Sequence, residues 1–172
     1  AGMGATVGKI LGMAGAMKAG IGTASRDLGG GAVVGAIVAV NALGDVIDSE
    51  SGKILAGARP AKLGPIRVGG PGPFADTMAV MLGMAGKRAL RFASRGNTVI
   101  GVVATNARLD KQGANKVAQM AQAGLARVIR PAQTMLDGDT IFALSTGAKK
   151  VDVNLSLIHI SEPTRPLYIS YA

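Results

Sequence analysis

Thr98 follows Asn97 where a basic, glycine-containing stretch (residues 94–97) gives way to an apolar run (residues 98–105). The run is rich in the β-branched residues that are typical of a buried strand. A hydroxyl residue at the start of such a strand, directly after an exposed loop, is well placed to act as a nucleophile on its own chain. Cleavage before Thr98 would free its α-amine, whose ordinary pKa of ~8 suits a general base for the neighbouring hydroxyl. An ordinary threonine at the start of a strand fits the same local sequence, so the Asn97-Thr98 pair alone does not distinguish a nucleophile from a structural residue.

Further stretches of the chain occur in a characteristic order. They are residues 4–9 (Gly-Ala-Thr-Val-Gly-Lys), 34–46, 54–59, 97–107 and 137–147. Taken together they resemble the P1 family of self-processing aminopeptidases, the L-aminopeptidase/D-esterase hydrolases, and the resemblance covers about residues 2–154. It implies an α/β fold, a layered α-β-β-α sandwich related to the ornithine acetyltransferase fold, here incomplete at the N-terminus.

Asn41 closes an apolar strand predicted at residues 32–40. A buried polar amide must find hydrogen bonds, so a structural turn asparagine is one interpretation. The resemblance implies another, in which the side-chain N–H of Asn41 stabilises the oxyanion that forms on the scissile carbonyl. One such donor contributes roughly 3 kcal/mol to lowering a barrier.

The sequence Asp137-Gly138-Asp139 precedes the last predicted strand, and an Asp-Gly turn explains it without any function. In relatives with a Ser-Gly-acidic version, the outer two residues contact the nucleophile and its amine. The resemblance therefore implies that Asp139 holds the α-amine of Thr98 in place. Asp137 replaces the serine of those relatives, which leaves its role open.

The resemblance implies a hydrolase of the N-terminal-nucleophile type that needs no cofactor. It would cut itself between Asn97 and Thr98, then remove the N-terminal residue from peptides, amides or esters through an acyl-enzyme on Thr98. Its partners would be such small substrates, the two segments of its own cleaved chain, and further copies of itself in a homo-oligomer. Two alternatives stay open: an acyltransferase of the ornithine acetyltransferase type, and an inactive, unprocessed fragment.

Three parts of the chain follow from this interpretation. Residues 1–97 form the C-terminal part of an α segment, and residues 98–154 form a β segment that begins with the nucleophile. Residues 155–172 are interpreted as a non-native tail. Because the family carries a substantial portion before residues 4–9, we expect the true N-terminus to be missing, so that the compartment cannot be inferred, although a cytoplasmic protein is favoured.

The tail reads like a translated DNA-sequencing adapter. Residues 155–165 resemble one reading frame of a common transposon-based adapter, residues 166–168 stand where its variable index would be, and residues 169–172 resemble its continuation. His159, the single histidine, lies in this tail and is therefore not a catalytic candidate. A natural extension with a short strand is the alternative.

Composition excludes several classes of protein. The net charge is +9, but the basic residues are scattered and there are only three Phe and two Tyr, which argues against a stacking surface for nucleic acid. The apolar runs are interrupted and too short to cross a bilayer, so no membrane partner is expected. The absence of Cys excludes thiolate sites, and without His159 no cluster has metal-ligand spacing. Residues 4–9 fail as a phosphate loop, because Ile10 stands where Ser or Thr should bind Mg²⁺.

Apolar spacing and turn residues predict the elements that must position these side chains. Residues 34–40 are nearly all apolar, which predicts a strand buried on both faces. Asn106 and Arg108 follow the Thr98 strand and either border a substrate cleft or are ordinary loop residues. The predicted elements are a helix at 6–19, strands at 21–28 and 32–41 around a glycine turn, a hairpin at 45–56, a short helix within 74–92, a strand at 98–105, a helix at 110–130 and a strand at 140–146.

Overall fold

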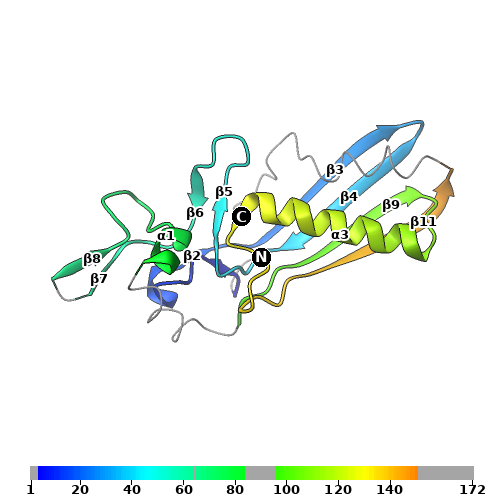
Figure 1. Cartoon of the computed structure of the whole chain (residues 1–172). Coiled ribbons are helices and arrows are strands. Elements are labelled where there is room, and N and C mark those ends of the chain that lie inside the picture. The colour runs from blue at the N-terminus through cyan, green and yellow to red at the C-terminus, as the bar shows by residue number, and fades with distance from the viewer. Residues whose placement is uncertain (1–3, 64, 84–95, 151–172) are drawn as a thin grey trace.

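In the computed structural model, which describes residues 4–63, 65–83 and 96–150, the largest element is a four-stranded sheet in the order β11-β9-β4-β3 (Figure 1). Its strands are β3 (Ile21–Gly29), β4 (Ala32–Ala39), β9 (Ile100–Ala107) and β11 (Thr140–Lys149). β3, β4 and β9 pair antiparallel, whereas β11 runs parallel to β9. The predictions of these four strands are confirmed, with shifted ends.

One face of this sheet is covered by α3 (Lys111–Val128), which connects β9 to the parallel strand β11 (Figure 1). Asp110 caps the helix by accepting a hydrogen bond from the Gly113 N–H at 2.7 Å. Val117, on the apolar stripe of the helix, packs in a buried cluster with Val34 and Val103 of the sheet. The helix predicted at 110–130 is thus confirmed, except that its last residues form the short strand β10 (Ile129–Arg130).

The opposite face of the sheet is exposed, so the prediction that residues 34–40 are buried on both faces is wrong for the described part of the chain. Side chains alternate between the two faces of a strand, and several of those on the face away from α3 are large and apolar. We call them the open face: Ile21, Val33, Ile37, Ile100, Phe142 and Leu144. Their exposed fractions lie between 41% and 57%.

A smaller sheet in the order β10-β5-β6 lies beside the first (Figure 1). β5 (Asp45–Ile47) and β6 (Ile54–Ala56) form the predicted hairpin, in whose turn Asp48 accepts a hydrogen bond from the Ser51 N–H at 2.7 Å. A buried cluster that contains Val46, Ala56, Leu125 and Ile129 joins this sheet to α3. The small sheet is therefore fixed to the same helix that covers the large one.

The helix predicted at residues 6–19 is wrong. The chain there forms β1 (Thr6–Val7), a 3-10 helix (Met13–Gly15) and β2 (Met17–Lys18), and the two strands pair antiparallel. Gly8 explains why a helix cannot form: its φ is +67°, and a Cβ at this position would overlap the backbone of Ala58. The apolar spacing suited a helix, but this tight approach requires a glycine in the left-handed region.

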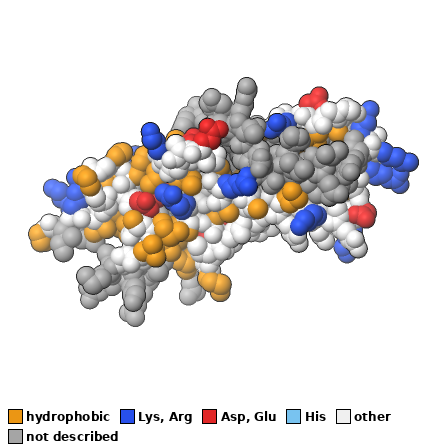
Figure 2. All heavy atoms as spheres, turned by 45° about the horizontal axis from the view of Figure 1, so that its top comes forward, with side chains coloured by type: hydrophobic (Ala, Val, Ile, Leu, Met, Phe, Trp, Pro, Cys, Tyr) orange, Lys and Arg blue, Asp and Glu red, His pale blue; other side chains and the backbone are white. Residues whose placement is uncertain are grey.

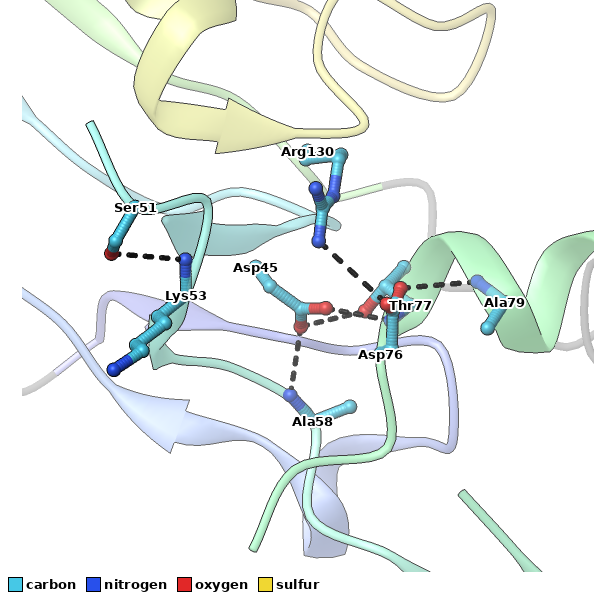
Figure 3. A network of polar contacts seen from close by, with 8 residues as sticks. All are labelled: Asp45, Ser51, Lys53, Ala58, Asp76, Thr77, Ala79 and Arg130. Atoms are coloured by element: carbon cyan, nitrogen blue, oxygen red, sulfur yellow. Dashed lines mark hydrogen bonds and ion pairs between the residues drawn. The ribbon is translucent and has the colours of Figure 1, made fainter. Parts of the chain in front are cut away.

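Asp45 anchors the segment that follows β6, as Figure 3 shows. Its buried carboxylate accepts hydrogen bonds from the Ala58 N–H at 2.9 Å, the Thr77 hydroxyl at 2.7 Å and the Thr77 N–H at 2.6 Å. Burial raises the pKa of Asp45, and the three donated hydrogen bonds partly offset this effect. Thr77 begins α1 (Thr77–Leu82).

The helix α1 confirms part of the short helix that is predicted within residues 74–92. Residues 84–92 lie outside the described residues. The strands β7 (Ala61–Leu63) and β8 (Ile66–Val68) form a hairpin that the sequence analysis did not predict.

Asp45→Ala is expected to destabilise the protein by about 3 kcal/mol or more, because buried donors on Ala58 and Thr77 would lose their acceptor at 1–3 kcal/mol each. Urea unfolding measures the loss. Asp48→Ala is the matched control, since water can replace its carboxylate as acceptor; we expect a clearly smaller loss than for Asp45→Ala. Equal losses in the two variants would contradict the anchoring role of Asp45.

Candidate active site

Thr98 lies two residues before β9, and hydrogen bonds hold both its backbone N–H and its side chain. Its N–H donates a hydrogen bond to the Asn41 carbonyl at 3.0 Å. Its hydroxyl Oγ1 donates to the carbonyl oxygen of Asn97, the residue before it, at 2.6 Å. Asn97 is buried and pairs with Asp137 in an isolated parallel bridge. The Thr98 hydroxyl is therefore held against the peptide group that it would have to attack.

The segment 137–139 runs beside this peptide group. The Gly138 N–H donates to the Asn97 carbonyl oxygen at 2.9 Å, and the Thr140 N–H donates to the Val99 carbonyl at the same distance. A Cβ at position 138 would lie 3.0 Å from Thr98 Oγ1, which is tighter than nearly all Cβ contacts. Gly138 thus allows the backbone to approach both the hydroxyl and the carbonyl.

Asn41 also lies at this position, after β4. Its side-chain Nδ2 donates to the Gly96 carbonyl at 2.8 Å, and its Oδ1 accepts from the Thr6 N–H at 3.1 Å. The structure therefore brings Asn41 next to Thr98, as the resemblance implied. Its amide donor, however, is bonded to the carbonyl one residue before Asn97.

Lys9 is a residue of this site that sequence reasoning missed. Its Nζ lies 2.6 Å from Asn41 Oδ1 and 3.0 Å from the Asn41 carbonyl oxygen, and the residue is only 4% exposed. Burial lowers the pKa of Lys9, and the negative charge of Asp137 partly offsets this shift. The available signal was a single lysine inside an otherwise uncharged stretch, residues 4–17.

Asp139 and Asp137 have different partners. Asp139 accepts hydrogen bonds from the Val99 N–H at 2.8 Å and the Gln133 N–H at 3.3 Å, so it holds the residue that follows Thr98. Burial raises the pKa of Asp139, and the charge of Asp137 raises it further. Asp137 accepts from the Thr134 hydroxyl at 2.7 Å and thereby shapes its own loop.

An open pocket of about 490 Å³ lies at Thr98. Its lining combines apolar and acidic residues, and it consists of Asn97, Thr98, Met135, Leu136, Asp137 and Gly138. Asn106 and Arg108 do not border it. Asn106 lies near the other end of β9, where it donates to the Gly31 carbonyl and accepts from the Val33 N–H. Arg108 follows β9 and bonds through its backbone N–H to Lys149.

The charged surface, the possible metal ligands and the helices bear on other kinds of site. Figure 2 shows Lys and Arg side chains spread from one end of the visible face to the other, not gathered in one patch. Within residues 4–63, 65–83 and 96–150, no group of three His, Cys, Asp or Glu is arranged to hold a metal ion. None of the helices in that part of the chain has the length and apolar composition needed to cross a bilayer.

The profile of peptidase family S58 matches residues 2–168, so the chain belongs to peptidase family S58. An uncharacterized aminopeptidase of Mycobacterium leprae is 43% identical over 151 residues, which cover 83% of this chain and 37% of that protein. A 6-aminohexanoate-oligomer endohydrolase of Paenarthrobacter ureafaciens is 30% identical over 127 residues, which cover 74% of this chain and 33% of that protein.

A solved structure also resembles this chain. It is a beta-aminopeptidase of Burkholderia sp., with a TM-score of 0.50 and 25% identity, and the match covers 93% of this chain and 40% of that chain. The chain thus spans only a third to two-fifths of the length of the proteins it matches.

Proposed function

We propose that this chain is part of a self-processing, threonine-type aminopeptidase and esterase that cuts itself between Asn97 and Thr98. One observation carries the proposal: Thr98 Oγ1 lies 2.6 Å from the oxygen of the Asn97 carbonyl group, whose carbon it would attack. A hydroxyl held beside this carbonyl group starts with part of the rate advantage of proximity, which becomes complete when Oγ1 turns to the carbon.

Self-cleavage would proceed by an acyl shift followed by hydrolysis. Thr98 Oγ adds to the Asn97 carbonyl carbon, its proton passes to the Thr98 nitrogen, and the carbon–nitrogen bond breaks. This leaves an ester between Asn97 and the Thr98 hydroxyl and a free α-amine on Thr98. Water then hydrolyses the ester to give the Asn97 carboxylate and the regenerated hydroxyl.

In turnover, the freed α-amine of Thr98 would act as general base for its own hydroxyl. Asp139 supports this role because it fixes the Val99 N–H, next to the nucleophile. Asn41 would donate to the oxyanion of the substrate, and Lys9 positions Asn41 through its two contacts. Asp137 completes the site as the acidic group of the pocket.

The proposed substrates are peptides, amides or esters with a free N-terminal amine. Asp137 offers a negative charge to that amine, while Met135 and Leu136 offer apolar surface to the adjoining side chain. We favour hydrolysis over acyl transfer because the names of the relatives describe aminopeptidases and an endohydrolase. The proposal includes a homo-oligomeric assembly, as the resemblance implies.

The open face supports a larger architecture. An apolar surface of this kind marks an interface, since soluble proteins seldom leave large apolar patches uncovered. The relatives are more than twice as long as the matched part. We therefore propose that a second sheet, from the rest of the full-length protein, packs on the open face and completes an α-β-β-α sandwich of the ornithine acetyltransferase type.

The experiment that tests the function uses the full-length gene product. Intact mass and N-terminal sequencing should find two fragments, one of which begins at Thr98. The cleaved protein should release the aniline and the free amino acid from aminoacyl anilides. A chain that stays intact after prolonged incubation, with no release of the aniline, would overturn the proposal.

Residues 155–172 lie outside the described residues, and the family match extends into them as far as residue 168. If they derive from an adapter, truncation after Asn154 should lower the unfolding free energy of the complete enzyme by no more than about 1 kcal/mol, the range of neutral surface changes. Urea unfolding of both forms measures this difference. A larger loss would show that the tail belongs to the protein.

A further inference from the structure

The two carbonyls before Thr98 are held by different donors. The Gly96 carbonyl accepts from the side-chain amide of Asn41 at 2.8 Å. The Asn97 carbonyl accepts from the backbone N–H of Gly138 at 2.9 Å and from the Thr98 hydroxyl at 2.6 Å. The donor assigned to the oxyanion by resemblance is therefore engaged elsewhere in the uncleaved chain.

We propose that the backbone N–H of Gly138 is the oxyanion donor for self-cleavage, and that Asn41 takes no part at that oxygen until the chain is cut. This inference rests on the proposed cleavage between Asn97 and Thr98. It adds a catalytic group, because the Gly138 N–H touches the oxygen on which charge develops.

Two groups donate hydrogen bonds to the Asn97 oxygen, and only one of them can still donate during the reaction. When Thr98 Oγ bonds to the Asn97 carbon, its proton leaves for the Thr98 nitrogen, so the hydroxyl can no longer donate to the oxygen. The oxygen becomes negative as its double bond opens. Of the donors described on this atom, only the Gly138 N–H then remains.

The surroundings of Gly138 hold its N–H in place before the reaction. Its bond to the Asn97 carbonyl is part of the parallel bridge between Asn97 and Asp137, and two residues further on the Thr140 N–H bonds to the Val99 carbonyl. A donor that is already oriented needs no reorganisation when charge develops, which is what makes oxyanion donors effective. Glycine suits this position because a Cβ would lie 3.0 Å from Thr98 Oγ1, and the hydroxyl would have to shift.

The arrangement also gives Asn41 one role before cleavage and another role after it. While the chain is intact, its amide fixes the Gly96 carbonyl and so the backbone before the cleavage point. Once the ester is hydrolysed and residues 96–97 can leave, that amide is released for a substrate. Cleavage would thus create the second donor of the mature site.

Replacing the peptide bond at the nitrogen of Gly138 by an ester, with glycolic acid in place of glycine, tests this directly in the full-length protein. The change removes one N–H and adds no side chain. Self-cleavage, followed by intact mass after dilution from denaturant, should slow by on the order of 10²–10³-fold, as for the loss of one oxyanion donor. The same ester at Thr140 is the matched control. It removes the neighbouring bond to Val99 and should slow cleavage by at most about tenfold.

A second variant keeps the test decisive if the ester at position 138 fails to fold, which circular dichroism reveals. Asn41→Ala should still cleave within about tenfold of the unmodified rate, because only one of its three side-chain hydrogen bonds, the bond to the Gly96 carbonyl, reaches the backbone before the cleavage point. If the unmodified protein cleaves but the folded Gly138 ester cleaves equally fast, or if folded Asn41→Ala is blocked, the inference is overturned. If the unmodified protein never cleaves at Thr98, it is the proposed function that fails.

Discussion

Thr98→Ala is expected to leave one uncleaved chain and to abolish aminopeptidase activity. The variant lacks the Oγ1 that lies 2.6 Å from the Asn97 carbonyl oxygen, so neither the acyl shift nor the acyl-enzyme can form. Intact mass should show the full chain alone, and anilide hydrolysis should fall by at least ~10³-fold. Both losses have the same cause, which makes this the largest effect we expect.

Two controls define this result. Thr98→Ser retains a hydroxyl and should still cleave, whereas Thr23→Ala, on the exposed strand β3, should leave both cleavage and turnover unchanged. Cleavage of the Thr98→Ala chain between residues 97 and 98 would refute the assignment of the nucleophile.

Asn41→Ala is expected to reduce turnover by on the order of 10²–10³-fold, the effect of losing one oxyanion donor. The amide of Asn41 lies beside the nucleophile, whose N–H bonds to the Asn41 carbonyl at 3.0 Å. kcat on an aminoacyl anilide, normalised to the cleaved fraction of the protein, measures the loss.

Asn106→Ala is the matched control, because Asn106 makes comparable hydrogen bonds at the far end of β9, to Gly31 and Val33. Its kcat should stay near that of the unmodified protein. A normal kcat for Asn41→Ala would show that this asparagine is only structural.

Much of the sheet was predictable because local and tertiary preferences agree there. The glycine turn at 29–31 and the β-branched residues of β4 specify the hairpin, and the apolar stripe of α3 specifies a helix with one buried face. Residues 6–19 were misassigned because apolar spacing outweighed the glycines. The left-handed φ of Gly8 is fixed by its contact with Ala58, which is distant in the sequence.

Residues of the candidate site that belong to a sequence motif through their side chains could be predicted. Groups of the backbone at the candidate site could not. Asn41 and Asp139 were named from the resemblance, and the structure places both beside the Thr98 peptide. Lys9 was missed because its partner, Asn41, is apparent only after the chain folds. The N–H of Gly138 has no sequence signature at all, since every residue except proline carries one.

The position of β9 between β4 and β11 has a consequence for the order of folding and cutting. A cut before Thr98 would leave β4 and β9 on separate polypeptides, still joined by the ladder from Val34–Thr105 to Ala39–Ile100. Unfolding would then become dissociation, and recovery would be a bimolecular encounter that slows with dilution. The intact precursor, by contrast, finds the same pairing within one molecule. A cut made after folding would therefore convert a chain that can re-form this pairing by itself into a two-chain complex whose recovery after unfolding depends on concentration.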